Sequence, residues 1–258
     1  MIRDVKILGV KVSRVNLKET MSLFEEWIQQ KLKKRICVLP VNCILWAYKN
    51  PELAAIYNSA ALCLADGVPL LWASRWLGFP IPGRVTGLDL LPAFAELASK
   101  REYSFFFMGA KEGVADLLAD TLRAKYPNLK IAGTYSPPFS NSFSEKENNK
   151  IIRLINTAKP DILWVSLTAP KQDIWIYQNY EKLDVSIALG VGGAFDVTAG
   201  IVRRAPLWMQ HAGLEWFYRF LKEPFRLFRR YFIEAPLFIP LIIAQVIKEK
   251  LFSQSTMQ

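Results

Sequence analysis

Short apolar runs alternate with amphipathic helical patterns from residue 36 to residue 190, and this alternation constrains the fold more than any other feature of the sequence. The runs YSFFFM, DILWVSL and VSIALGVG have the length and the continuous hydrophobicity of buried strands. Strands that are separated by helices pair in parallel, and a parallel sheet is covered by helices on both faces. The sequence therefore predicts an α/β domain with a predominantly parallel sheet.

Two helix starts can be placed in the N-terminal part of the sequence. Asn16 and Glu19 have the spacing of a capping box, and apolar residues follow them at helical intervals. Asn50 followed by Pro51 predicts a second helix start, after a strand that we expect at residues 36–41.

The pattern changes after Gly200, where aromatic and arginine-rich helical segments continue without a further strand. We therefore expect a catalytic α/β domain at residues 1–200 and a helical appendage at residues 201–258. Seven basic and two acidic residues fall between Val202 and Arg230, which accounts for half of the net charge of +10.

The appendage also contains a hydrophobic segment at residues 231–247. Glu234, Pro236 and Pro240 interrupt it, so its uninterrupted apolar part is too short for a bilayer core of about 30 Å. Aromatic residues interleaved with arginine suit the headgroup boundary, where anionic lipids attract each basic residue by about 1 kcal/mol. We predict that the appendage holds the protein peripherally on the inner face of the cell membrane. A helical cap on the sheet and a homo-oligomer interface are the alternatives.

Several classes of site have no support in the sequence. The N-terminus lacks a secretory signal, which predicts a cytoplasmic protein. Cys37, Cys43 and Cys63 have neither metal-binding nor disulfide spacing, and the single histidine, His211, lies in an aromatic segment where we expect a packing role. There is no GxGxxG fingerprint, no P-loop and no DxD motif. We therefore expect no cofactor and no metal.

Ligands of parallel α/β sheets bind at the carboxyl ends of the strands, and four segments follow predicted strands there. Asp66 and Gly67 come after one short strand, and residues 108–113, 167–173 and 190–196 follow three others. The glycines in these segments allow a ligand to approach the backbone closely, and the helix starts suit phosphate.

The order of motifs along the chain resembles the WecG/TagA/CpsF glycosyltransferase family over nearly its whole length. The motifs are ADGVPLLWASR, RVTGLDLL, FFFMGAKEG, DILWVSLTAPKQD, GVGGAFDVTAG, RRAPLW and GLEWFYRFLKEPFRL. The resemblance implies a Rossmann-like domain with a C-terminal appendage that docks on the membrane and completes the active site. It also implies an inverting transfer of an N-acetylmannosamine-type sugar, or a related hexose or uronic acid. The implied donor is a UDP-sugar, and the implied acceptor is an undecaprenyl-diphosphate-linked sugar used for cell-surface polymers.

The resemblance also assigns roles to individual residues. Asp66 is the implied catalytic base, Arg84 and Gln172 are further implied catalytic residues, and Asp173 stands where the family has glutamate. The residues expected to contact the UDP-sugar are Asn42, Gly109, Ala110, Gly113, Tyr135, Gly190, Gly192, Gly193 and Asp196. The residues expected to contact the acceptor diphosphate and the membrane are Arg203, Arg204, Arg219, Arg226 and Arg229.

The same residues admit simpler structural roles. Asp66 could cap the helix that follows it, Arg84 could form a surface ion pair with Asp89, and Gln172 could lie exposed on its helix.

Two other function classes are a basic nucleic-acid-binding protein and a soluble nucleotide-sugar epimerase or dehydrogenase. We disfavour the first because the basic residues are concentrated beside aromatic residues in the appendage, and we expect no nucleic-acid partner. We disfavour the second because the dinucleotide fingerprint is absent.

Overall fold

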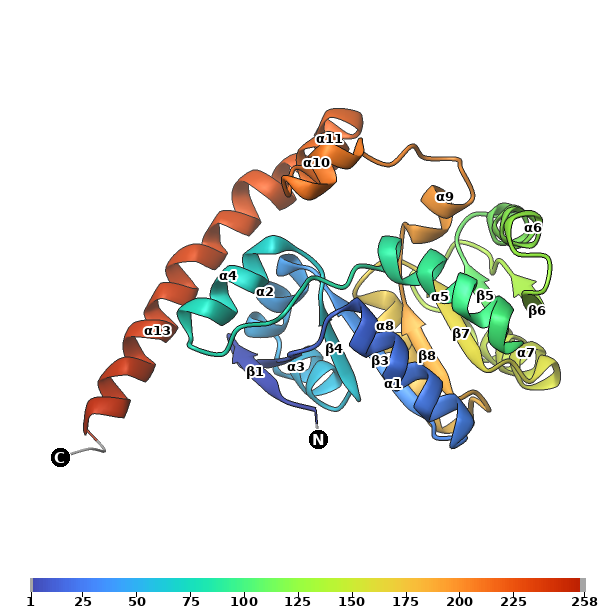
Figure 1. Cartoon of the computed structure of the whole chain (residues 1–258), viewed down its shortest axis with the longest axis horizontal. Coiled ribbons are helices and arrows are strands. Elements are labelled where there is room, and N and C mark those ends of the chain that lie inside the picture. The colour runs from blue at the N-terminus through green and yellow to red at the C-terminus, as the bar shows by residue number, and fades with distance from the viewer. Residues whose placement is uncertain (1, 256–258) are drawn as a thin grey trace.

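A parallel sheet forms the centre of the molecule (Figure 1). The computed structural model describes residues 2–255, with the side chains of all of them except residue 211 and residues 252–255. Within these residues the main sheet has six strands, all paired in parallel, in the order β4-β3-β8-β7-β5-β6. The strands are β3 (Lys34–Leu39), β4 (Leu62–Ala65), β5 (Ser104–Gly109), β6 (Lys130–Tyr135), β7 (Ile162–Ser166) and β8 (Ile187–Gly190). The predicted parallel α/β fold is confirmed.

Helices cover both faces of this sheet, as predicted. One face packs against α1 (Leu17–Gln29), α5 (Gly87–Arg101), α6 (Val114–Lys125) and α9 (Ala194–Thr198). The other face packs against α2 (Val41–Lys49), α3 (Pro51–Asn58), α4 (Val68–Trp76), α7 (Glu145–Ala158) and α8 (Lys171–Asn179), which continues into η1 (Tyr180–Lys182). Side chains alternate between the two faces along each strand, so Phe105 and Phe107 are buried on the first face, and Phe106 and Met108 on the second.

Both predicted helix starts are confirmed. The Asn16 backbone N–H donates to the Glu19 carboxylate at 2.8 Å, and the Glu19 N–H donates back to the Asn16 side chain at 2.9 Å. The side-chain oxygen of Asn50 accepts from the N–H of Glu52 at 3.0 Å, and Pro51 is the first residue of α3.

Two parts of the N-terminal region differ from the sequence prediction. The strand expected at residues 36–41 ends at Leu39, because Pro40 has no N–H for the sheet and instead precedes α2, which the sequence did not indicate. The first residues form an antiparallel hairpin of β1 (Asp4–Ile7) and β2 (Val10–Ser13), each only four residues long.

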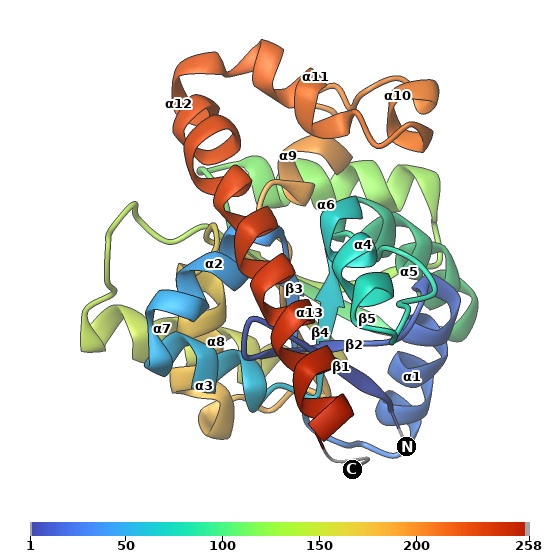
Figure 2. The same ribbon diagram turned by 90° about the vertical axis from the view of Figure 1, so that its left-hand side faces the viewer.

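All regular secondary structure of the appendage in the described residues is helical, and residues 201–206 connect it to the α/β domain without a helix or strand. It comprises α10 (Leu207–His211), α11 (Glu215–Lys222), α12 (Pro224–Phe228), η2 (Arg229–Glu234), η3 (Ala235–Leu237) and α13 (Phe238–Ser255). Figure 2 shows α10, α11 and α12 above the α/β domain, and α13 running down along its side. No described residue after Gly200 lies in a strand, as predicted.

Glu234, Pro236 and Pro240 interrupt the apolar sequence, but they do not interrupt the helix. The chain is helical from Pro224 to Leu251, and its winding changes to a π turn in η2 and a 3-10 turn in η3 next to the first proline. Pro240 lies in the first turn of α13, where a backbone N–H needs no partner within that helix.

By length and composition alone this helix could cross a membrane, and most of its apolar stretch is not buried in the protein. The length of the apolar segment therefore no longer argues against crossing. One face of α13 nevertheless packs on the α/β domain. Phe238 and Ile242 are buried there, and the Gln245 side chain accepts from the N–H of Leu8 at 2.8 Å.

Candidate functional site

Asp66 follows β4 at the carboxyl edge of the sheet and is partly buried. The residue that caps α4 is Gly67, at φ +130, and no side chain makes a capping hydrogen bond there. The simpler role of Asp66 as a helix cap is therefore wrong. Burial raises the pKa of Asp66 to about 6, although the charges of Arg219, Arg230 and Arg84 act in the opposite direction. A carboxylate with this pKa can accept a proton near neutral pH.

Two of these three arginines belong to the appendage. Arg219 lies on α11 and Arg230 on η2, whereas Arg84 precedes α5 in the α/β domain. A methyl group placed on Gly193 would lie 3.6 Å from Nη2 of Arg219, so this side chain reaches the loop after β8. The sequence analysis did not predict Arg230 as a site residue, because the only signal for it was its position in a run of basic residues.

Four ionic side chains join the appendage to the α/β domain. Arg204 contacts Asp89 at 2.6 Å through Nη2 and Glu215 at 2.7 Å through Nε. Arg84 contacts the same two carboxylates, Glu215 at 3.5 Å and Asp89 at 4.0 Å. The expected pair of Arg84 and Asp89 is thus part of a larger and partly buried network, which we call the interdomain ion network. No local pattern in the sequence marked Glu215. Carboxylates contact the Arg204 guanidinium on both sides.

Gln172 fixes the loop after β8. Its side chain is buried, at 3% exposure, and its oxygen accepts from the N–H of Gly192 at 3.0 Å. A Cβ on Gly190 would lie 2.4 Å from Cγ of Gln172, so only glycine fits at that position. The alternative that Gln172 lies exposed on its helix is wrong, and its contacts indicate that it positions the glycine loop.

Ser166, at the end of β7, links two neighbouring loops. Its carbonyl accepts from the N–H of Ala110 at 2.7 Å, and its hydroxyl donates to the carbonyl of Gly192 at 2.8 Å. A Cβ on Gly109, which has φ +110, would lie 2.3 Å from the Ser166 carbonyl oxygen. Gly113, at φ +79, is the N-cap residue of α6. The sequence signal for Ser166 was its hydroxyl, the one polar side chain after the aspartate in the run DILWVSL. The sequence analysis used this run to predict a strand but did not use the hydroxyl.

The remaining predicted donor contacts are more dispersed. Asn42 is buried at the start of α2, close to the end of β3, and Asp196 lies on α9. The Tyr135 hydroxyl donates to Glu147 at 2.6 Å and accepts from Lys150 at 2.7 Å.

Tyr135 lies far from Asp66 across the sheet. It ends β6, which is one edge strand, whereas Asp66 follows β4, which is the other. Five strand spacings, or about 24 Å, separate these strands. Tyr135 is therefore outside any site that contains Asp66, whereas Arg219 both acts on Asp66 and reaches Gly193 in the loop after β8.

The other predicted arginines lie on the surface of the appendage. Arg203 is exposed. Arg226 pairs with Glu223, and Arg229 pairs with Glu234 at 3.2 Å. Of the appendage arginines expected at the site, Arg219 is the one whose charge acts on Asp66.

Among the described residues, no group of three or more histidine, cysteine, aspartate or glutamate side chains could hold a metal ion. His211 ends α10, and its predicted packing role concerns a side chain outside the described part. Cys37, Cys43 and Cys63 are buried and free, as predicted.

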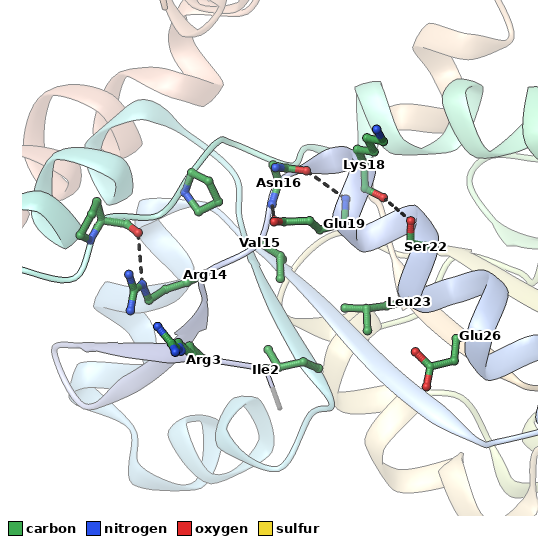
Figure 3. Close-up of a pocket in the computed structure, with 12 residues that line it drawn as sticks. Ile2, Arg3, Arg14, Val15, Asn16, Lys18, Glu19, Ser22, Leu23 and Glu26 are labelled. Carbon is green, nitrogen blue, oxygen red and sulfur yellow. Dashed lines mark hydrogen bonds between the residues drawn. The ribbon is translucent and has the colours of Figure 1, made fainter.

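A surface groove of about 810 Å³ lies between the hairpin, α1 and the turn at Pro80 and Pro82 (Figure 3). None of the predicted site residues lines it. The side chains of Asn16 and Glu19 face it but are used to cap α1, and the Arg14 guanidinium donates to the Pro80 carbonyl at 3.2 Å. We assign no ligand to this groove.

The fold and the site together define an α/β enzyme with a carboxylate base candidate and arginines at the carboxyl ends of its strands. Residues 5–252 match the Glycosyl transferase WecG/TagA/CpsF family, and the chain belongs to this family. The predicted resemblance and the glycosyltransferase class are confirmed.

Three relatives carry the name N-acetylglucosaminyldiphosphoundecaprenol N-acetyl-beta-D-mannosaminyltransferase. The relative from Bacillus subtilis (strain 168) is 30% identical over 204 residues, which cover 79% of this chain and 77% of the relative. The relative from Bacillus spizizenii is 32% identical over 180 residues, covering 70% and 68% of the two chains. The relative from Staphylococcus aureus (strain MW2) is 25% identical over 221 residues, covering 85% of each.

Proposed function

We propose that this chain transfers N-acetylmannosamine from a UDP donor to N-acetylglucosamine linked to undecaprenyl diphosphate. The observation that carries the proposal is Asp66, a partly buried carboxyl with a pKa of about 6, surrounded by the charges of Arg219, Arg230 and Arg84. The substrates follow the names of the relatives from Bacillus and Staphylococcus.

In the proposed reaction, Asp66 removes the proton from the attacking hydroxyl of the acceptor sugar. The hydroxyl oxygen then forms a bond to the anomeric carbon of the donor sugar while the bond from that carbon to UDP breaks, with inversion. Negative charge develops on the departing diphosphate, and preorganised positive groups stabilise it. Arg84 supplies one such group from the α/β domain, and Arg219 and Arg230 supply two from the appendage.

The glycine loop after β8 is the proposed support for the donor. Gln172 and Ser166 hold this loop through the N–H and the carbonyl of Gly192, respectively. Gly193 presents its backbone next to Arg219, so a diphosphate bound there would meet both an arginine and an exposed stretch of main chain. Gln172 in this proposal is a positioning residue and does not touch the reacting atoms.

We further propose that the enzyme works at the inner face of the cell membrane, because its acceptor is anchored in lipid. The appendage carries exposed apolar and aromatic side chains that suit the headgroup boundary. Its most exposed examples are Leu207, Trp208, Leu221, Phe225 and Leu251.

The test is UDP release by the purified full chain with a water-soluble prenyl-diphosphate-linked N-acetylglucosamine as acceptor. We expect UDP-N-acetylmannosamine to be used fastest among a panel of UDP-sugars. Faster turnover of another UDP-sugar would overturn the assignment of the sugar but not that of the class. No turnover of any UDP-sugar would overturn the proposed reaction.

The role of the arginines predicts a reaction that is insensitive to metal removal. Turnover after extensive dialysis against EDTA should equal turnover with added magnesium. A loss of activity that magnesium restores would contradict this proposal and would assign the diphosphate charge to a metal ion.

A further inference from the structure

Three aromatic side chains on and after α4 are exposed and take no part in the proposed site. Trp72, Trp76 and Phe79 are 49%, 46% and 51% exposed. Trp72 and Trp76 lie four residues apart on one side of the helix, whereas Leu70 and Leu77 on its other side are buried. The exposed aromatic side chains therefore form one apolar patch, which we call the outer face of α4.

This outer face lies beside the appendage. Both ribbon views show α4 next to α13 (Figures 1 and 2), and the two helices cover the same buried cluster with Leu70 and Leu77 from α4 and with Phe238 and Ile242 from α13. The exposed side of α13 carries apolar residues at intervals of four. These residues are Ile239, Ile243, Ile247 and Leu251. Two adjacent helices thus present apolar side chains to solvent.

Basic side chains accompany the aromatics. Arg75 is exposed between Trp72 and Trp76. The Arg14 guanidinium lies 5.9 Å from the centre of the Phe79 ring, and Arg3 lies close to Arg14 along the groove (Figure 3). Tryptophan interleaved with arginine is typical of surfaces that sit at the headgroups of anionic bilayers. Arg75, Arg14 and Arg3 add an electrostatic attraction to anionic headgroups.

We propose that the outer face of α4 is a second membrane contact, so that the α/β domain itself rests on an anionic bilayer through Trp72, Trp76 and Phe79. This inference rests on the proposed action at the membrane and extends it from the appendage to the domain. Helix α4 begins directly after Asp66 and Gly67 and has nine residues. Trp72 and Trp76 then lie about 6 Å and about 12 Å along the helix axis from its first residue, which keeps the proposed base close to the lipid surface and suits an acceptor whose diphosphate lies at the headgroups.

The experiment compares the full chain with the double variant Trp72→Ala/Trp76→Ala in sedimentation with vesicles. One vesicle contains phosphatidylglycerol and phosphatidylcholine, and the other contains phosphatidylcholine alone. We expect the double variant to bind the anionic vesicles about tenfold more weakly than the unchanged chain, because two large aromatic groups no longer enter the interface. The control is Leu117→Ala, on α6 at the opposite end of the molecule from α13, where the side chain is 45% exposed (Figure 1).

Folding is checked by thermal melting and by transfer to the water-soluble acceptor, both of which should remain at the level of the unchanged chain. Vesicle binding equal to that of the unchanged chain would overturn the inference and leave the proposed reaction standing. A change in oligomeric state by analytical ultracentrifugation, with vesicle binding unchanged, would also overturn it and assign the face to a second copy. If the unchanged chain transfers no sugar, the proposed reaction fails. Weaker vesicle binding by a double variant with unchanged thermal melting would then still support the inference.

Discussion

At the residue scale, Asp66 is subject to two opposing effects. Burial disfavours the carboxylate, whereas the positive charges of Arg219, Arg230 and Arg84 favour it. The balance leaves a pKa of about 6, so that the group is mostly ionised at neutral pH and still basic enough to accept a proton. Replacing Asp66 by Asn removes the base with little change in shape, and transfer should fall about 100-fold or more. Near-normal turnover of a folded Asp66→Asn variant would exclude Asp66 as the base.

The pH dependence of kcat/KM tests the same residue. Because the base must be deprotonated, kcat/KM should rise with pH through about 6 and level off above it. Arg219 lowers the pKa of Asp66, so Arg219→Ala should move this rise to higher pH. Arg203 is exposed and is not among the causes of the raised pKa of Asp66. Arg203→Ala should therefore leave the pH at which kcat/KM rises unchanged. A rise that stays at the same pH in Arg219→Ala would contradict the assignment.

Asp173 is a second carboxyl with an unusual environment. It is buried, and neither carboxylate oxygen has a hydrogen-bond partner. Burial raises its pKa to about 7, and the charge of Arg35 offsets this only in part. The folded state therefore holds a proton that the unfolded chain releases at about pH 4.

Asp173→Asn should consequently change how stability depends on pH. A carboxyl with a raised folded-state pKa stabilises the fold below its unfolded pKa and loses that stability as pH rises to the folded value. The unchanged chain should lose stability between about pH 4 and pH 7, by at most about 4 kcal/mol at 1.36 kcal/mol per pKa unit. The Asn variant should lack this part of the pH dependence, whereas the part from Asp66, whose pKa is also raised, should remain in both proteins. Denaturant unfolding at pH 5 and pH 8 measures it, and parallel changes in both proteins would argue against a protonated Asp173.

At the element scale, the interdomain ion network decides how α11 sits over the α/β domain. Glu215 is buried and contacts both Arg84 and Arg204, and Arg204 in turn contacts Asp89. An exposed ion pair contributes less than about 1 kcal/mol, but removing one partner of a buried pair costs about 3–5 kcal/mol. Glu215 therefore matters more to the position of α11 than the outer pairs of the appendage do.

Glu215→Gln should lower kcat about tenfold, because Arg84 loses one of its two carboxylate contacts and α11 is held less firmly over Asp66. Vesicle binding should stay unchanged, since the apolar faces of the appendage are intact. Glu223→Gln is the matched control, because Glu223 pairs only with the exposed Arg226. Unchanged kcat and KM in Glu215→Gln would show that the network has no role in positioning Arg84.

The sequence predicted those elements whose signals are local. The capping residues Asn16 and Asn50, the continuous apolar runs of the strands and the glycines after β5 and β8 each express a constraint on neighbouring residues. Helix α2 was missed because Pro40 was included in the strand, and Glu215 was missed because its partners lie far away in the chain. The alternatives for Asp66 and Gln172 failed for the same reason, since their surroundings come from other elements.

At the scale of the whole molecule, the appendage contacts the α/β domain in two places. One is near Asp66 at the carboxyl ends of the strands, and the other is along the side of the domain. Its first helices bring Arg219 and Arg230 to Asp66. Helix α13 then returns along the domain to the hairpin, where the side chain of Gln245 accepts from the N–H of Leu8 and donates to the carbonyl of Lys6. One continuous segment thus connects the arginines at the site with the face that we assign to the membrane.

This connection predicts two separable defects. A chain that ends at Gly200 should lose sugar transfer and most of its vesicle binding, because the arginines and α13 are both removed. Arg219→Ala should bind vesicles as the unchanged chain does, since Arg219 is one charge among many, yet should transfer sugar poorly because the loop at Gly193 loses its arginine. Transfer to the water-soluble acceptor and sedimentation with anionic vesicles measure the two defects separately. Full transfer by Arg219→Ala would confine the appendage to docking, whereas full transfer by the chain ending at Gly200 would place the whole active site in the α/β domain.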